Sequence, residues 1–375
     1  MKVTHIFWSL GFGGIETMLI NIANAQAEAG AKVSIIIIND LCEESLVNAL
    51  RKDVKLCRLN RKLHSKGFGF ILKLNRELRC LNPDIIHLHA SMFYKMIWNR
   101  KYSREACSTL HDLPTGSVRR GGLLADLICK LVGHKQGYSN VVNINRIPKV
   151  FAISNAVQEA LWRDYHVKSA VVCNGIVTKR FNQRLNQMPS TTFRIVMVSR
   201  LEHNKKGQDL LIEAAAQLRS RVSVDFIGAG SSMDYLQSLV QQLHIEEYVH
   251  FLGEQTQDYI AAHLFDYDLF VQPSRWEGFG LTVAEAMAAH VPVLVSEGQG
   301  PAEVTCGNRY GWLFANGNAR ALAEQIDYII SHYEEAMDKA DKARVYVQNV
   351  YDVSITARKY LHEYEMTKID NNVKI

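Results

Sequence analysis

The stretch "DLFVQPSRWEGFGLTVAEAMAAHVPVLVS" (268–296) decides the fold class. It opens with a short apolar run that ends at Ser274, passes through a Gly-Phe-Gly turn into a helical pattern, and closes with a second apolar run, 291–296. Two short apolar runs on either side of a helix predict a β-α-β unit of a parallel sheet, with helices on both faces. The same stretch carries two glutamates, Glu277 before the turn and Glu285 inside the helix. A buried helix alone does not explain them.

The same alternation of apolar strands and helices runs along the whole chain. Strands are expected in the first half at 3–8, 32–40, 83–90, 106–112, 149–154 and 169–176. In the second half they are expected at 194–200, 222–228, 249–253, 268–274 and 291–296. This order predicts an α/β fold with two tandem Rossmann-like, doubly wound domains. We expect them to face each other across a ligand-binding cleft.

A chain of 375 residues is long for one hydrophobic core, which favours two domains. We expect an N-terminal domain over 1–180 and a C-terminal domain over 194–354, joined by the polar, strand-poor linker 181–193. A final helical pattern, 354–368, follows the second domain. We expect the C-terminal helix, 355–375, to cross back to the first domain.

The composition is that of an ordinary globular protein, with 47% apolar and 22% charged residues. No apolar run approaches the roughly 18 residues of a membrane span, and the N-terminal residues lead into a strand without a small-residue cleavage site. We therefore expect a cytoplasmic protein. The cysteines are odd in number and scattered without a C-x-x-C pair, so we expect reduced thiols. They are Cys42, Cys57, Cys80, Cys107, Cys129, Cys173 and Cys306.

Positive charge is concentrated in one part of the chain. Residues 51–150 hold 20 Lys/Arg against six acids, a balance of +14, whereas the whole chain is only +5. The segments 65–81 and 119–135 mix basic residues with Phe, Ile and Leu, as do helices that lie on anionic lipid. The alternative is a core-facing apolar stripe with a solvated basic face. No aromatic-basic recognition motif supports a nucleic-acid partner.

The turn after the strand that ends at Ser274 is a candidate phosphate site. Backbone amides at a helix start are unpaired donors, and the helix dipole favours an anion there. The amides concerned are those of Gly278, Phe279, Gly280, Leu281 and Thr282. Glu277 is placed to reach hydroxyl groups of the ligand, and Glu285 to accept hydrogen bonds from a ribose. Alternatively, Glu285 supports the helix dipole and Glu277 is solvated.

The segment "VSRLEHNKKGQDLLIEA" (198–214) brings cations to the same edge of the sheet. Arg200 follows a strand, and Lys205 and Lys206 precede Gly207 at the next helix start. An arginine and a lysine are the usual pair for a diphosphate in the absence of a metal. Read alone, the lysines are typical of a solvated turn.

In the first half, the Gly-rich turn in "IFWSLGFGGIETMLINIA" (6–23) resembles a nucleotide-binding turn. Gly13 and Gly14 lie between strand and helix, but Glu16 and Thr17 stand where G-x-G-x-x-G needs its third glycine. The turn therefore gives little support to an NAD-dependent enzyme.

Three histidines lie at strand ends in the first half. His111 lies at the end of the strand expected at 106–112 and is expected to face the cleft, although a histidine is often only a surface or core residue. His87 and His89 alternate with apolar residues and point to one face of a strand. No Asp, Glu or Cys at suitable spacing completes a ligand set, so no metal site is expected.

Taken together, these motifs resemble the retaining nucleotide-sugar glycosyltransferases of glycosyltransferase family 4, which have the two-domain GT-B fold. The resemblance covers nearly the whole chain. It rests on "GGIE" (13–16), "PDIIHLHA", "TLHD", "FAISNAV", "VCNGI", "VSRL" with "KKG", "IGAG", "FLGE", "YGWLFANGNARALAEQI" (310–326) and the E-x7-E pair Glu277 and Glu285. Ser199 stands where the family usually has glycine, and two adjacent lysines precede Gly207.

The resemblance implies a role for each candidate residue. Glu277 would bind the donor sugar, Glu285 the ribose, and Arg200 with Lys206 the diphosphate. His111 would lie beside the transferred sugar, and Gly13 and Gly14 would contact diphosphate or acceptor. The base would lie against Phe251, Leu252, Gly253 and Glu254.

The implied function is retaining transfer of a hexose or N-acetylhexosamine from a nucleotide diphosphate sugar, UDP-linked, without metal or other cofactor. The acceptor would be a saccharide, lipid-linked, in cell-surface polysaccharide assembly at the inner membrane face. Two alternatives stay open. One is a non-catalytic nucleotide-sugar-binding assembly subunit, and the other is a nucleotide-sugar epimerase on the same scaffold.

Overall fold

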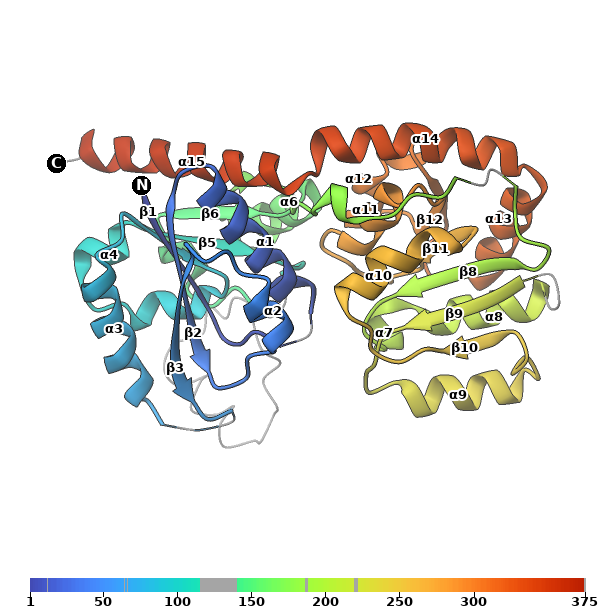
Figure 1. The fold of residues 1–375 in the computed structure, drawn as a ribbon, viewed down its shortest axis with the longest axis horizontal. Helices are drawn as coiled ribbons and strands as arrows, with labels where there is room; N and C mark the ends of the chain where they lie inside the picture. The colour runs from blue at the N-terminus through green and yellow to red at the C-terminus, as the bar shows by residue number, and fades with distance from the viewer. Residues whose placement is uncertain are drawn as a thin grey trace. The chain divides into compact units, whose positions relative to one another are not determined.

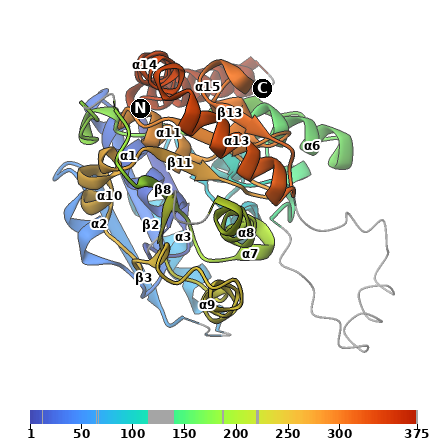
Figure 2. The ribbon, with the colours of Figure 1, turned by 90° about the vertical axis from the view of Figure 1, so that its right-hand side faces the viewer.

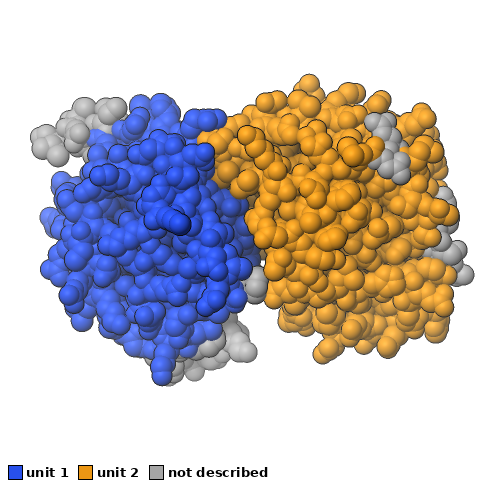
Figure 3. Space-filling view, in the orientation of Figure 1, with its two compact units in different colours: residues 1–173, 357–375 blue, residues 174–356 orange. Residues whose placement is uncertain are grey.

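A computed structural model describes residues 1–11, 13–63, 65, 67–114, 140–185, 188–218 and 222–373, the last five of these as backbone only. The chain divides into two compact units, which Figure 3 colours separately. Unit 1 comprises 1–173 and 357–375, and unit 2 comprises 174–356. The C-terminal residues therefore belong to unit 1, and the segment 181–193 belongs to unit 2.

Unit 1 is built on a seven-stranded parallel sheet in the order β3-β2-β1-β4-β5-β6-β7 (Figure 1). The strands are β1 Lys2–Phe7, β2 Lys32–Asn39, β3 Lys55–Arg61, β4 Ile85–Leu88, β5 Ala106–Leu110, β6 Lys149–Ala152 and β7 Ala170–Val171. The α-helices are α1 Gly14–Glu28, α2 Glu44–Asn48, α3 Gly69–Leu81, α4 Arg100–Arg104, α6 Asn155–Tyr165 and α15 Val353–Val373. The central strands β1, β4 and β5 are buried almost throughout, as expected for a parallel sheet with helices on both faces.

Unit 2 repeats this design with a six-stranded parallel sheet in the order β10-β9-β8-β11-β12-β13. The strands are β8 Phe193–Val198, β9 Val222–Ile227, β10 Val249–Phe251, β11 Leu269–Gln272, β12 Val293–Ser296 and β13 Trp312–Phe314. The helices are α7 His203–Lys206, α8 Gln208–Leu218, α9 Met233–Gln242, α10 Gln257–His263, α11 Leu281–Ala288, α12 Gly300–Val304, α13 Ala319–Ser331 and α14 Tyr333–Val350. Figure 2 shows the strands of this unit beside α8 and α13.

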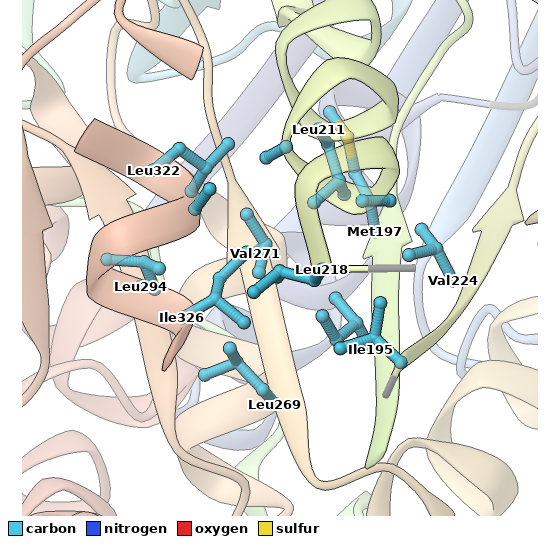
Figure 4. Packing of buried hydrophobic residues seen from close by; sticks show 14 of the residues in the cluster. Ile195, Met197, Leu211, Leu218, Val224, Leu269, Val271, Leu294, Leu322 and Ile326 are labelled. Carbon is cyan, nitrogen blue, oxygen red and sulfur yellow. The ribbon is translucent and has the colours of Figure 1, made fainter. Parts of the chain in front are cut away.

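The core of unit 2 lies between one face of its sheet and the helices α8, α9 and α13. Figure 4 shows strand side chains that pack against these helices, including Ile195, Met197, Val224, Leu269, Val271 and Leu294. The helices contribute Leu211, Leu218, Leu322 and Ile326. Each of these side chains is at most 8% exposed, and burying one such aliphatic group stabilises the fold by about 1.5–3 kcal/mol. This packing supports the sheet whose carboxyl end carries the candidate site.

The predicted α/β class with two Rossmann-like units is confirmed, but several elements differ from the expectation. The strands β3 and β13 and the helix α14 were not expected, and β7 covers only two residues of the segment 169–176. The strand β3 lies at a sheet edge, where apolar residues alternate with exposed charged ones, so it lacks a continuous apolar run. The predicted cleft between the units stays a prediction.

Six cysteines in the described part of the chain are free thiols, as expected for reduced cysteines: Cys42, Cys57, Cys80, Cys107, Cys173 and Cys306. Cys129 lies outside the described residues. No helix in the described ranges has both the length and the apolar character that crossing a membrane requires.

Candidate active site

The loop between β11 and α11 in unit 2 is held by its neighbours. The hydroxyl of Ser296 donates to the carbonyl oxygen of Ser274 at 2.6 Å. The backbone amide of Glu277 donates to Oε1 of Gln299 at 3.0 Å, and the amide of Gly300 donates to the carbonyl of Glu277 at 3.1 Å. The start of α12 therefore fixes the backbone at Glu277. Gln299 was not singled out from the sequence.

The start of α11 presents unpaired amide groups. Gly280 precedes the helix with a φ of 98°, a left-handed conformation that suits glycine. Within the described ranges, the amides of Leu281 and Thr282 have no hydrogen-bond acceptor. Free amides at the positive end of a helix dipole favour an anionic group.

A direct contact joins Lys206, at the end of α7, to Glu277. Lys206 Nζ donates to Oε2 of Glu277, and each side chain is 17% exposed. The pair is therefore largely shielded from water but still reachable. The sequence predicted both residues separately, and the fold brings them together across 71 positions.

Arg200 follows β8 at the same edge of the sheet. Its carbonyl oxygen accepts a hydrogen bond of 2.8 Å from Nε2 of Gln208, which also donates to Oγ of Ser199 at 3.0 Å. The side chain of Arg200 is exposed and has no ion-pair partner within the described part of the chain. The backbone here is fixed while the guanidinium is available to a ligand.

Arg275 supports the segment that carries the lysines, and the sequence did not indicate this. Its guanidinium binds both carboxylate oxygens of Asp209 at 2.8 Å each, and Nη1 donates to the carbonyl of His203 at 2.7 Å. Its backbone amide donates to the carbonyl of Lys205 at 2.9 Å. Arg275 therefore ties the loop before Glu277 to the short helix α7.

Glu285 lies inside α11 and is 7% exposed. Burial raises the pKa of its carboxyl from 4.5 to about 7, and a hydrogen bond from Gln257 and the charge of Arg180 oppose that rise. Nε2 of Gln257 donates to Oε1 of Glu285 at 2.7 Å. Sequence reasoning missed Gln257, since nothing in its local pattern indicates a partner 28 positions away.

The predicted base-binding segment follows β10. The ring of Phe251 stacks on Phe226 with centroids 5.3 Å apart, and the carbonyl of Gly253 accepts from the amide of Gly228 at 2.7 Å. In a parallel sheet the segments after β8, β10 and β11 all lie at the carboxyl ends of the strands, on the same side of the sheet. The candidate residues of unit 2 therefore share one edge of its sheet, from Arg200 through Phe251, Leu252, Gly253 and Glu254 to Gly278, Phe279 and Gly280.

In unit 1, Gly14 is the first residue of α1 and Gly13 precedes it, at the carboxyl end of β1. A Cβ on Gly13 would lie 2.3 Å from Oε2 of Glu16. Because this oxygen is the far end of a flexible side chain that can move away, the space around Gly13 does not by itself require a glycine.

His111 follows β5 directly, as predicted, and its ring is held by another histidine. Its Nε2 lies 2.9 Å from Nδ1 of His89, while its Nδ1 is buried and has no partner among the described residues. Burial lowers the pKa of His111 to about 3, although the charge of Asp112 opposes this. The ring is therefore neutral near pH 7, with one nitrogen unused.

His5, His87 and His89 form a buried group with ligand atoms within 4.8 Å of one another, a spacing compatible with a metal ion. His5 was missed in the sequence, because it comes from β1, far along the chain from the other two. Every ring nitrogen of the three already has a hydrogen-bond partner. Burial also lowers the pKa of each ring, to about 4 for His5. A metal would have to break these hydrogen bonds, so the absence of a metal site stays our prediction.

Two family models match the chain in succession. Residues 12–180 match the model described as glycosyltransferase family 4, and residues 178–346 match the model described as glycosyl transferases group 1. The chain belongs to glycosyltransferase family 4. The predicted membership is confirmed.

Known relatives of this glycosyltransferase agree with the assignment. A putative colanic acid biosynthesis glycosyltransferase, WcaL of Escherichia coli K12, is 33% identical over 169 residues, which are 42% of this chain and 41% of WcaL. The chain thus matches less than half the length of that relative. An uncharacterised glycosyltransferase of Methanocaldococcus jannaschii is 25% identical over 98% of both chains.

Solved structures share the fold of this glycosyltransferase. HepE of Anabaena, solved in complex with UDP and glucose, superposes with a TM-score of 0.77 at 21% identity, over 97% of this chain and 99% of that chain. A sucrose-phosphate synthase from Thermosynechococcus elongatus gives a TM-score of 0.79 at 19% identity, over 98% and 99% of the two chains. The predicted GT-B fold class is confirmed.

Proposed function

We propose that this glycosyltransferase moves a hexose or N-acetylhexosamine from a UDP-sugar to a lipid-linked saccharide acceptor, with retention of anomeric configuration. Glu277 binds the sugar, Glu285 the ribose, and Arg200 with Lys206 the diphosphate. The free amides at the start of α11 add to the diphosphate site, and the base lies against the segment 251–254.

The observation that carries the proposal is the Lys206–Glu277 contact, which precedes the helix start where the amides of Leu281 and Thr282 have no acceptor among the described residues. It places a cation, a carboxylate and a helix N-terminus within one small region of unit 2. A sugar diphosphate presents the matching groups, hydroxyls that donate to a carboxylate and an anion that takes amides and cations. A bound diphosphate would compete with Glu277 for Lys206.

The proposed reaction follows from where charge develops. As the bond between the anomeric carbon and the diphosphate breaks, negative charge gathers on the leaving oxygen. Arg200, Lys206 and the α11 amides therefore stabilise the transition state more than the ground state. These fixed cations can supply the charge that a divalent ion supplies in other enzymes, so we propose that transfer needs no metal.

Retention is proposed to occur by attack on the face that the leaving group vacates. Glu277 already pairs with Lys206, and a paired carboxylate is a poor nucleophile. The acceptor oxygen forms the new bond to the anomeric carbon, and its proton passes to the departing diphosphate oxygen. This step balances charge and atoms without a covalent enzyme intermediate.

The donor and acceptor classes draw support from relatives. HepE has been solved with UDP and with UDP-glucose, and TarM of S. aureus with UDP. Relatives are named for the biosynthesis of colanic acid, amylovoran and O-antigen. We extend UDP and a polysaccharide precursor to this chain on that basis.

The helix α3 supports the proposal of an acceptor at the inner membrane face. It buries Phe70, Leu74 and Leu78 but leaves Leu72 exposed, and Phe68 just before it is also exposed. The cations Lys73, Arg76 and Arg79 are exposed on the same helix, and Lys62 is exposed in the loop before it. Both readings of this sequence therefore hold in part, a core-facing stripe and an exposed mix of apolar and basic groups. The second predicted segment, 119–135, lies outside the described residues.

A thermal-shift panel of UDP, GDP and ADP, each with and without attached sugars, tests the proposed donor. We expect UDP and one UDP-sugar to raise the melting temperature, because a ligand that binds only the folded state stabilises it by mass action. Slow hydrolysis of that same UDP-sugar, unchanged by EDTA, is the second expected result. Stabilisation by GDP or ADP alone, or hydrolysis abolished by EDTA, would contradict the proposal.

A further inference from the structure

A continuous chain of buried polar groups runs through unit 1 behind His111. His111 Nε2 lies 2.9 Å from His89 Nδ1, and His89 Nε2 lies 3.0 Å from His5 Nδ1. His5 Nε2 in turn lies 2.8 Å from the amide oxygen Oε1 of Gln26, on α1. Gln26 and His5 are both 0% exposed, and His89 is 4% exposed. Water therefore does not compete for these contacts.

The donors and acceptors along this chain follow from Gln26. An amide oxygen can only accept, so His5 must carry its proton on Nε2. A neutral imidazole has one N–H and one acceptor nitrogen, so Nδ1 of His5 accepts from Nε2–H of His89. By the same rule, Nδ1 of His89 accepts from Nε2–H of His111. The proton of His111 is thereby placed on Nε2, and Nδ1 is left as an acceptor.

This assignment of donors and acceptors requires the rings of His5, His89 and His111 to be neutral. Burial lowers the pKa of His5 to about 4 and that of His111 to about 3, and it holds the pKa of His89 well below the ordinary value. A ring with two N–H groups would break the sequence of donors and acceptors. None is expected near pH 7.

The Gln26 amide has a second arm of contacts on its other side. Its Nε2 donates to the hydroxyl oxygen of Tyr364 on α15 at 3.4 Å. The Tyr364 hydroxyl oxygen lies 2.6 Å from Nδ1 of His87, and Nε2 of His87 lies 2.7 Å from Oγ1 of Thr109. Turning the amide round would place an N–H donor against Nε2 of His5 and would reverse the hydrogen bonds from His5 to His111.

The series of hydrogen bonds that begins at Gln26 ends at the ring of His111. Nδ1 of His111 is buried and unpartnered among the described residues. Buried N–H groups without an acceptor are rarer than under-used acceptors, which favours a lone pair on this nitrogen over a proton. A lone pair on this nitrogen can accept a hydrogen bond, and the hydroxyl groups of a sugar can donate one.

We propose that Gln26 is a positioning residue that holds His111 in the Nε2–H tautomer, so that its Nδ1 accepts a hydrogen bond from a hydroxyl of the transferred sugar. The identity of the ligand rests on the proposed function, whereas the tautomer does not. A tautomer with a proton on Nδ1 would turn a donor toward the sugar hydroxyl and weaken that contact.

The test is a long-range ¹H–¹⁵N correlation spectrum of the full chain with ¹⁵N-labelled histidine at pH 7.5. The signals of His111 are assigned by their loss in His111→Gln. In the wild type, Nδ1 of His111 is expected to be unprotonated and Nε2 protonated. In Gln26→Met, which keeps the side-chain length but removes the amide, the ratio of the two tautomers is expected to fall about tenfold or more. Thr109→Val, which removes a buried hydroxyl in the other arm, is the matched control and should leave the His111 tautomer unchanged.

Three results would overturn the inference. They are a proton on Nδ1 of His111 in the wild type, an unchanged tautomer ratio in Gln26→Met, or an equal change in Thr109→Val. The wild-type spectrum decides even if a variant fails to fold. Kinetics separate this inference from the proposed function. We expect Gln26→Met to lower the turnover of the UDP-sugar about tenfold with unchanged UDP affinity, whereas an enzyme without any UDP-sugar activity leaves the tautomer result standing.

Discussion

Lys206 and Glu277 contact each other at the edge of the unit 2 sheet, although 71 positions separate them in the sequence. One follows β8 and the other follows β11, two strands that are neighbours in the sheet. The contact places a cation and a carboxylate beside the free amides of α11. The proposed donor site depends on this arrangement.

The first prediction concerns Arg275, which touches no proposed ligand. Arg275→Lys keeps the positive charge but loses the bidentate contact to Asp209. The loop before Glu277 and the helix α7 should therefore move apart. We expect affinity for UDP to fall about tenfold, a loss of roughly 1.4 kcal/mol, in isothermal titration calorimetry. Arg320→Lys, in an exposed pair with Glu324, is the control and should bind as the wild type does. Wild-type affinity in Arg275→Lys would show that this support is dispensable.

The second prediction concerns the buried carboxyl of Glu285. Because its pKa is raised from 4.5 to about 7, the folded state holds this proton more tightly than the unfolded state does. The stability gained is complete below pH 4.5 and is lost as the pH rises to about 7. At pH 8, Glu285→Gln should therefore raise the free energy of unfolding, by up to about 3 kcal/mol, and at pH 4 it should change little.

Urea unfolding across this pH range is the measurement, and Glu324→Gln on the exposed face of α13 is the control. The same Glu285→Gln variant should bind UDP more weakly, because an amide is a poorer acceptor for ribose hydroxyls than a carboxylate. A variant that is less stable at pH 8 than the wild type would contradict the burial argument.

The third prediction concerns the buried ion pair of Arg184 and Asp268, whose side chains are 6% and 0% exposed and 2.6 Å apart. Asp268 also accepts from the backbone amides of Ser190 and Arg194. Asp268→Ala would remove the carboxylate that balances the charge of a buried guanidinium, so we expect a loss of about 3–5 kcal/mol in urea unfolding. Asp164→Ala, in the exposed pair with Arg163, should leave stability unchanged within error. Similar losses in the two variants would argue against the buried pair as the cause.

The fourth prediction tests the membrane surface of α3. A double variant, Phe68→Ser with Leu72→Ser, should reduce sedimentation with vesicles of phosphatidylglycerol and phosphatidylcholine, since two exposed apolar anchors are lost. Wild-type binding should also weaken in 0.5 M salt, because salt screens the attraction between the basic residues of α3 and the anionic lipid. The control is Leu185→Ser with Met188→Ser, exposed residues of unit 2. Salt-insensitive or absent binding of the wild type would remove the membrane proposal.

The fold class could be predicted because the buried strands carry their own signal. Runs such as residues 35–38 in β2 are apolar on both faces, and that pattern needs no knowledge of tertiary contacts. The strand β3 was missed because its exposed face is charged, and β13 because three residues are too short for a periodic pattern. Edge strands depend on their neighbours more than on their own composition.

The site was predictable where a motif places residues on one local element. Glu277 and Glu285 frame a single turn and helix, so their position relative to α11 follows from the sequence. Gln257, Gln299 and Arg275 were missed because each acts through a partner that only the fold brings near. The chain from Gln26 to His111 joins β1, α1, β4 and the end of β5, and no local pattern indicates it.

The most direct test of the account measures sugar transfer and UDP affinity side by side in Glu277→Ala. We predict that transfer falls by about a hundredfold or more, because Glu277 binds the sugar, while UDP affinity stays within about threefold of the wild type, because Arg200, Lys206 and the α11 amides remain. Glu334→Ala, an exposed glutamate on α14, should retain full activity. Full transfer activity in Glu277→Ala would contradict the assignment of the donor site.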